Sequence, residues 1–149
     1  MNLPPAFNAP ALAIALTLGS ALPAGAGEFS VSCSFKNENL RKCATVIKDL
    51  VSDKFTTRFP AAKYQIFVHS SVVGFTNGGY GAYAVSGVIP AGSGRFPVHT
   101  FSNTNINGSD TRFSQIDLSK VELTTYRAAV QNLMEQCEIS PTCDVYTAE

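Results

Sequence analysis

Tryptophan is absent from this chain, and histidine and methionine are scarce: the 149 residues include no Trp, two His and two Met. Charge is sparse as well, because Asp, Glu, Lys and Arg make up 15% of the residues, and the 11 basic side chains balance the 11 acidic ones. A chain without net charge lacks the electrostatic attraction that draws proteins to nucleic acids or anionic membranes. We therefore expect neither as a partner.

The first 26 residues contain no charged side chain. Residues 11–22 form an apolar run, and Ala24-Gly25-Ala26 has the small-x-small form of a cleavage site. These features predict a signal peptide over residues 1–26 and a single mature domain over residues 27–149, periplasmic or secreted. A membrane anchor is the alternative, but it needs about 20 consecutive apolar residues, and proline and glycine interrupt this stretch.

Four cysteines in an exported chain predict two disulfides. No CxxC pair and no Cys/His cluster with zinc spacing occurs, so we expect no metal and no cofactor. Cys33 and Cys43 flank the passage from a predicted strand to a predicted helix, and Cys137 and Cys143 flank the end of the last helix. We favour Cys33–Cys43 with Cys137–Cys143. The rival is Cys43–Cys137 with Cys33–Cys143, because sequence alone does not fix the connectivity.

The N-terminal part of the mature chain predicts a strand and a helix. Residues 28–35 alternate between apolar and polar side chains, as in a half-buried strand. Apolar residues at helical spacing then predict a helix from Asn37 to Phe55, ended by Phe59-Pro60. This helix and its flanks carry a basic stripe that is either a solvated face or an anion- or partner-binding patch: Arg41, Lys42, Lys48, Lys54, Arg58 and Lys63.

Three runs of strand character follow, over residues 63–75, 80–89 and 95–101. Asn77-Gly78 joins the first two, and it is a strong hairpin signal because a type I′ turn needs positive φ at both central residues. The second link, residues 91–94, suits a four-residue hairpin loop. We expect a three-stranded antiparallel meander.

The polar residues 102–110 are typical of an exposed loop, and residues 112–118 are a possible fourth strand. Helical spacing then predicts a second helix that starts at Ser119 or Thr124, with residues 119–122 as a capping box, and that ends at Ser140-Pro141. The predicted fold is α+β: a strand, a helix, a three- to four-stranded meander and a C-terminal helix, with both helices on one sheet face.

Side chains alternate between the faces of a sheet, so a chosen register assigns each residue to one face. With residue 69 opposite residue 86, and residue 86 opposite residue 99, we expect an apolar face against the helices that carries Ile66, Val68, Val72, Tyr83, Val85, Ile89, Phe96 and Val98. The opposite face is mixed, and a row His69–Ser86–His99 would cross it beside Phe67, Arg95 and Phe101.

The mixed face suggests two classes of function. Aromatic and Arg side chains favour protein interfaces, so our primary hypothesis is a non-enzymatic protein-binding domain, such as an inhibitor, immunity factor or envelope-assembly factor. Its predicted binding residues are Phe67, His69, Ser86, Arg95, His99 and Phe101. The alternative is a small hydrolase or phosphodiesterase in which His69 and His99 act as base and acid over Ser86. A carrier with an apolar cavity between sheet and helices is a third possibility.

Two short resemblances accompany these hypotheses. His69-Ser70-Ser71-Val72 resembles the His-x-Ser/Thr-hydrophobic motif of the two-histidine phosphoesterases, although Thr100 follows the second histidine one position early. The strand–helix–meander order resembles the cystatin-like architecture. However, the chain has no tryptophan for the Pro-Trp hairpin of that family, and residues 65–69 lack the glycine of its Gln-x-Val-x-Gly loop.

Overall fold

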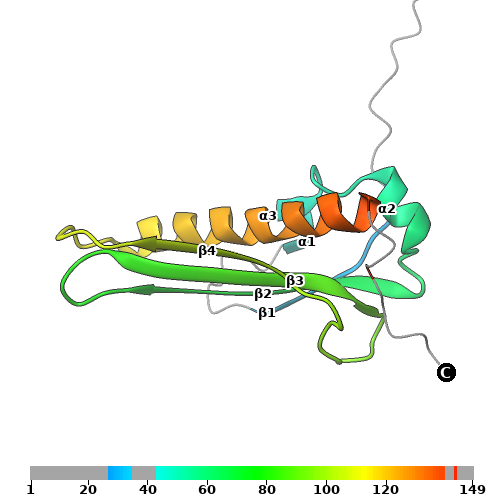
Figure 1. The fold of residues 1–149 in the computed structure, drawn as a ribbon, viewed down its shortest axis with the longest axis horizontal. Coiled ribbons are helices and arrows are strands. Elements are labelled where there is room, and N and C mark those ends of the chain that lie inside the picture. Colours follow the sequence, from blue (N-terminus) through cyan, green and yellow to red (C-terminus); the bar gives the residue numbers. More distant parts are fainter. Residues whose placement is uncertain (1–26, 35–42, 140–142, 144–149) are drawn as a thin grey trace, which may run out of the picture.

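The computed structural model describes residues 27–34, 43–139 and 143. The elements follow in the order β1 (Val31–Ser34), α1 (Cys43–Ile47), α2 (Asp53–Arg58), β2 (Tyr64–Gly74), β3 (Tyr80–Pro90), β4 (Phe101–Asn107) and α3 (Gln115–Ile139). The strands form one sheet in the order β1-β2-β3-β4, with β1 parallel to β2 and the other neighbours antiparallel. The helices lie on one side of it (Figure 1). The predicted α+β class is confirmed, with the correction that the sheet is mixed. The predicted signal peptide lies outside the described residues.

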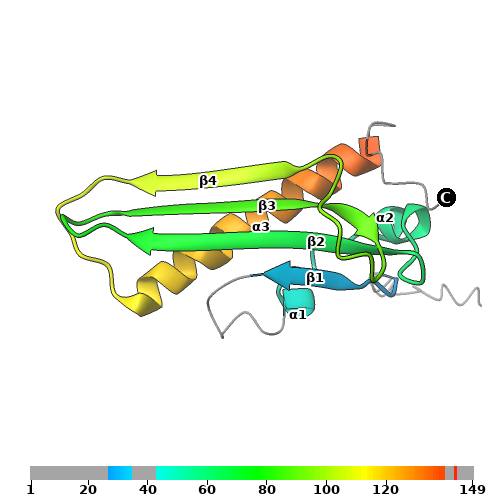
Figure 2. The same ribbon diagram turned by 90° about the horizontal axis from the view of Figure 1, so that it is seen from below.

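The core lies between the sheet and α3. This helix has 25 residues, which makes it about 37 Å long at 1.5 Å per residue. It runs obliquely across the sheet, from the end of β2 to the beginning of β4 (Figure 2). Its inner stripe of Tyr126, Val130 and Leu133 belongs to the same buried cluster as Ile66 and Val68 of β2. Burial raises the pKa of the Tyr126 hydroxyl far above its usual value.

Two buried serines connect the sheet to α3. Ser70 of β2 donates to the carboxylate of Glu122 over 2.9 Å, and Glu122 is only 2% exposed. Ser86 of β3 donates to the backbone carbonyl of Ala129 over 2.7 Å. Because Ser70, Ser86 and the intervening Ala84 are small, the backbone of the helix can approach the sheet closely. These bonds fix where α3 lies along β2 and β3.

Arg127 on the other side of α3 fixes the N-terminal helices. Its guanidinium bonds the Val46 carbonyl and forms two bonds to the carboxylate of Asp49, of 2.8 and 2.6 Å. This contact lowers the pKa of Asp49. A lowered carboxyl pKa adds stability above the unfolded pKa, and that stability is lost as the pH falls through the folded value. Asp49 is well exposed, so the pair contributes less than about 1 kcal/mol.

The predicted first helix is broken in two. Its apolar stripe is placed as expected, since Cys43, Ile47, Val51 and Phe55 are buried. However, Ser52 has an extended backbone and its hydroxyl accepts the Phe55 N–H, so it begins a new helix as an N-cap. The predicted positions 37–42 lie outside the described residues.

The register between β2 and β3 differs by one residue from the predicted one. Val68, not His69, lies opposite Ser86. The hairpin loop holds three residues, 76–78, because Phe75 bonds Gly79, and positive φ falls on Gly78 and Gly79 rather than on Asn77.

A one-residue shift exchanges the faces of a strand. Ile66 and Val68 face the helices as predicted. Tyr83 and Val85 of β3, which were expected against the helices, lie on the opposite face. Ala82, Ala84 and Ser86 are buried on the helix side.

The predicted third strand at residues 95–101 is wrong. Residues 91–100 form a loop, and β4 occupies Phe101–Asn107, within the stretch expected to be a loop. Pro97 has no N–H for a ladder, and Gly92 and Gly94 have positive φ. A strand at the sheet edge needs no continuous apolar face, which is why the polar pattern of β4 did not predict it.

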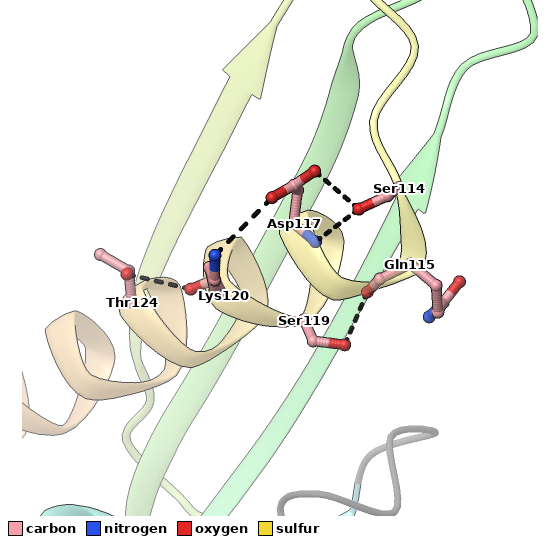
Figure 3. Close-up of polar contacts among 6 residues, drawn as sticks. All are labelled: Ser114, Gln115, Asp117, Ser119, Lys120 and Thr124. Atoms are coloured by element: carbon pink, nitrogen blue, oxygen red, sulfur yellow. Dashed lines mark hydrogen bonds and ion pairs between the residues drawn. The ribbon is translucent and has the colours of Figure 1, made fainter.

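The predicted strand at residues 112–118 is also wrong, because α3 begins at Gln115. Ser114 is the residue that caps it: its hydroxyl accepts the Asp117 N–H over 3.2 Å and donates to the Asp117 carboxylate over 2.6 Å (Figure 3). The hydroxyls of Ser119 and Thr124 instead donate to carbonyls one turn earlier in the helix. The predicted helix start at Ser119 or Thr124 is therefore too late by about one turn or more.

Both favoured disulfides are confirmed, and the rival pairing is wrong. Cys33–Cys43 joins β1 to α1 with a Cα–Cα distance of 6.6 Å. Cys137–Cys143 joins the last turn of α3 to the chain that follows it, with a Cα–Cα distance of 5.1 Å. Helix α3 ends at Ile139, in agreement with the predicted stop; Ser140 and Pro141 lie outside the described residues.

We predict that Ser70→Ala destabilises the domain by about 1–3 kcal/mol, because Glu122 stays buried but loses its donor. Urea unfolding of the disulfide-intact chain measures the change. Ser71→Ala, one residue away on the other face, is the control and should change stability by less than about 0.5 kcal/mol. Equal effects of the two substitutions would show that the Ser70–Glu122 bond contributes nothing.

Candidate functional site

The sheet face opposite the helices is the candidate site, and we call it the open face. Figure 2 shows the sheet from this side, with α3 behind it. The strand registers place the following side chains or glycines there: Ser32, Ser34, Gln65, Phe67, His69, Ser71, Val73, Gly81, Tyr83, Val85, Gly87, Ile89, Ser102, Thr104 and Ile106. The face therefore combines apolar groups with hydroxyls and one histidine.

Exposed apolar side chains gather at the end of the open face near the β2–β3 turn. We call this group, Val73, Phe75, Tyr83 and Ile106, the distal patch. Val73 is 57% exposed, Tyr83 45% and Ile106 70%. Gly81 lies among them: a Cβ there would be 3.2 Å from the Phe75 ring, so the ring rests on the glycine backbone. Water contacts most of this surface, although its side chains are those that proteins usually bury.

The other end of the open face is covered by residues 91–100, which we call the strap. The strap lies on the side of the sheet away from α3 (Figure 1). Phe96 contacts Phe67 with the ring centroids 5.1 Å apart. Pro97 is buried directly over Gly87, where a Cβ would lie 2.4 Å from the proline side chain. The absence of a side chain at Gly87 is therefore what lets the strap reach the sheet.

The predicted row His69–Ser86–His99 does not form. His69 lies on the open face, where its Nε2 is 2.9 Å from the Tyr83 hydroxyl. Ser86 points to the opposite side, toward α3. His99 belongs to the strap and is exposed. The one-residue register difference turns Ser86 away from His69, and residues 95–100 form no strand that would place His99 in such a row.

The remaining predicted binding residues also lie in different parts of the molecule. Phe67 is on the open face as predicted, half-buried beneath Phe96. Arg95 is exposed in the strap. Phe101 is on the helix side and packs against the core. It was assigned to the wrong face because the β2–β3 register, predicted one residue off, exchanges the faces of β3 and of the strand paired with it.

The arrangement expected of a two-histidine hydrolase is only partly present, because Ser86 faces α3 and not the open face. Such a mechanism needs two imidazoles near one reacting group, one as base and one as acid. Within residues 27–34, 43–139 and 143, no three or more His, Cys, Asp or Glu side chains gather as a metal site would require.

The space between sheet and α2 offers no room for a carrier ligand. It is lined by Phe29, Phe55, Phe59, Tyr64 and Ile66 among others, and these side chains fill it. A hollow of about 490 Å³ occurs elsewhere, between α2 and the end of α3, lined by Lys54, Thr57, Arg58, Cys137 and Glu138. Lys54 and Arg58 belong to the basic stripe, whose described members are all exposed. Arg58 bonds the carbonyl of Cys137.

Sequence reasoning missed the distal patch and the strap. Tyr83 and Ile106 were placed against the helices or in a loop, because the register and β4 were misjudged. Two signals for the strap were present in the sequence: Pro97 in a run assigned as a strand, and two glycines, Gly92 and Gly94, just before it.

No protein-family model, curated protein or solved structure matches this chain. Among the described helices, none combines the length and the apolar character needed to cross a bilayer.

We predict that Gly87→Ala displaces the strap, because a Cβ at this position would overlap Pro97. Overpacking of this kind costs about 1–3 kcal/mol. Trypsin should then cut faster after Arg95, and the rate measured by mass spectrometry reports the release. Gly108→Ala, which meets nothing within 4 Å, is the control. An unchanged rate in the first variant would mean that the strap is not held by this contact.

Proposed function

We propose that the protein is an exported domain that binds another protein through its open face. The observation that carries this proposal is the distal patch: Val73, Tyr83 and Ile106 stay exposed on one sheet face, while the helices cover the other. Exposed apolar groups that adjoin one another and are rimmed by polar ones are typical of interaction sites. Here the rim consists of Ser71, Thr104 and other hydroxyls.

The dimensions of the open face suit a protein partner. Strands of 11 residues extend about 36 Å, and a four-stranded sheet is about 15–20 Å wide. The resulting area, about 500–700 Å², approaches the roughly 800 Å² that each side contributes to a standard interface. The strap adds Phe96 and Val98, which are 58% and 45% exposed. An inhibitor, an immunity factor or an envelope-assembly factor would each use such a surface.

Export is supported by two independent features. The N-terminal 26 residues have the form of a signal peptide. Both disulfides are formed, and disulfides form and persist in oxidising compartments. The hydrolase alternative uses His69 and His99 over Ser86, but Ser86 faces α3.

The test of the binding proposal uses two isoleucines that are both 70% exposed: Ile106 in the distal patch and Ile116 on α3. The mature chain, carrying a photo-crosslinker at residue 73, is used to isolate its partner from the envelope or culture fluid of the source organism. Loss of a central contact costs at least about 1.4 kcal/mol, so Ile106→Asn and Tyr83→Ser should each weaken the measured Kd about tenfold or more. Ile116→Asn should leave it unchanged.

Two results would overturn this proposal. One is an equal loss of affinity in Ile106→Asn and Ile116→Asn, which would show that binding does not depend on the distal patch. The other is the absence of any partner that crosslinks in the wild-type chain and is lost in Tyr83→Ser.

We also predict that expression of the full chain in a secreting host yields a product that begins near Gly27, because Ala24-Gly25-Ala26 is a cleavage signature. N-terminal sequencing of the exported fraction gives the answer. The thiol count of that product should be zero under denaturing, non-reducing conditions, since both disulfides are formed. A product that keeps residues 1–26 would contradict the assignment.

A further inference from the structure

The outer side of β4 is a sheet edge that α3 approaches only near its beginning (Figure 2). β4 is the last strand of the sheet, and no strand in the described part of the chain pairs with its outer side. Proteins usually protect such edges with Lys, Pro, inward charges or bulges. The seven residues of β4, Phe-Ser-Asn-Thr-Asn-Ile-Asn, include none of these side chains. An edge of this composition is suited to pairing with another strand.

The hydrogen-bond pattern shows which backbone groups point outward. In β3 and its flanks, the Gly79 carbonyl accepts the Phe75 N–H, and the Ala91 N–H donates to the Lys63 carbonyl, both on the β2 side. Because the direction alternates along a strand, the odd-numbered residues of β3 bond β2 and the even-numbered ones bond β4. The partners of those even residues are residues 101, 103, 105 and 107. The N–H and C=O groups of Ser102, Thr104 and Ile106 therefore point to the free edge.

A bond from α3 agrees with this assignment. The side-chain amide of Asn132 donates to the Ser102 carbonyl over 3.2 Å, which requires that carbonyl to point away from β3. The helix approaches β4 only near the beginning of the strand (Figure 2). In this view the distal part of β4 lies away from α3.

We propose that β4 pairs with β4 of a second copy of this chain, antiparallel and about a two-fold axis through Thr104. The three outward-pointing residues are symmetric about Thr104, so this register uses all of them: Thr104 bonds Thr104 of the second copy, and Ser102 bonds Ile106. Each such pair exchanges two backbone bonds. A two-fold axis one residue away would leave the outward groups of either Ile106 or Ser102 opposite a residue beyond the end of the partner strand.

The side chains are self-complementary in the same register. On the helix side, Asn103 lies opposite Asn105 of the second copy, and directly opposed side chains in a sheet are close enough to bond. The Asn105 oxygen accepts the Tyr80 hydroxyl over 3.3 Å, so its NH₂ group is the part that can donate to Asn103 across the axis. No charged residue lies in β4, so no like charges meet at the axis.

The paired sheets would form one sheet of eight strands, with both helix layers on the same side. This inference uses the backbone edge of β4, whereas the proposed function uses side chains of the open face. Ile106 belongs to both, so Tyr83→Ser, which lies outside β4, distinguishes failure of one proposal from failure of the other.

Sedimentation equilibrium of the mature, disulfide-intact chain tests the pairing. We expect a reversible dimer over low micromolar to near-millimolar concentrations. Thr104→Pro removes an outward N–H that the monomer does not use, so it should keep the circular-dichroism spectrum and Tm while weakening dimerisation at least tenfold. Thr104→Val keeps the N–H and should dimerise like the wild type.

A charge exchange tests the position of the axis. Thr104→Lys and Thr104→Glu each place two like charges side by side in a homodimer, so each variant alone should be monomeric, and an equimolar mixture should recover the dimer. A wild-type chain that stays monomeric at the highest concentration would overturn the proposal. So would a dimer that Thr104→Pro leaves unchanged, or charge variants that do not recover on mixing.

Discussion

The close approach of α3 to the sheet is the constraint on which the rest of the structure depends. Ser70 and Ser86 are small enough to admit the helix and polar enough to bond it, through Glu122 and the Ala129 carbonyl. These contacts place the helix obliquely, so that its outer side meets the N-terminal helices through Arg127. The buried apolar side chains of α3, such as Tyr126, Val130 and Leu133, thereby face one side of the sheet. Among the described residues, no helix covers the distal half of the other side (Figure 2).

The sequence predicts those elements of the fold that depend on local residue patterns. Asn-Gly-Gly marks a turn, alternating apolar residues mark β1 and β2, and the spacing of cysteines around helix ends indicates both disulfides. The prediction from sequence fails where the strand register depends on whether a loop is one residue longer or shorter. Whether Asn77 or Gly79 takes positive φ is decided by contacts of the turn with residues 107–111, which no local pattern encodes. That choice alone moves Tyr83 and Val85 from the core to the surface.

Dependence on strand register also limits the prediction of the candidate site. His69 and Phe67 were placed correctly because β2 has an unambiguous pattern, whereas Ser86 and Phe101 were not, because the faces of β3 and β4 depend on register. β4 itself is hard to recognise, since Asn and Ser are poor strand formers, and its partner β3 supplies the order that the local sequence lacks. The open face is therefore a product of strand pairing, which the sequence of any single strand does not encode.

The two margins of the sheet differ greatly in length. β1 has four residues and is tied to α1 by a disulfide, while β4 has seven. A subunit with two equal, long margins can add neighbours on both sides and grow into a fibre. A subunit with one long margin and one short, anchored margin can add only one neighbour by this route, after which growth stops. Because β1 is short and anchored, association through β4 would stop at a dimer.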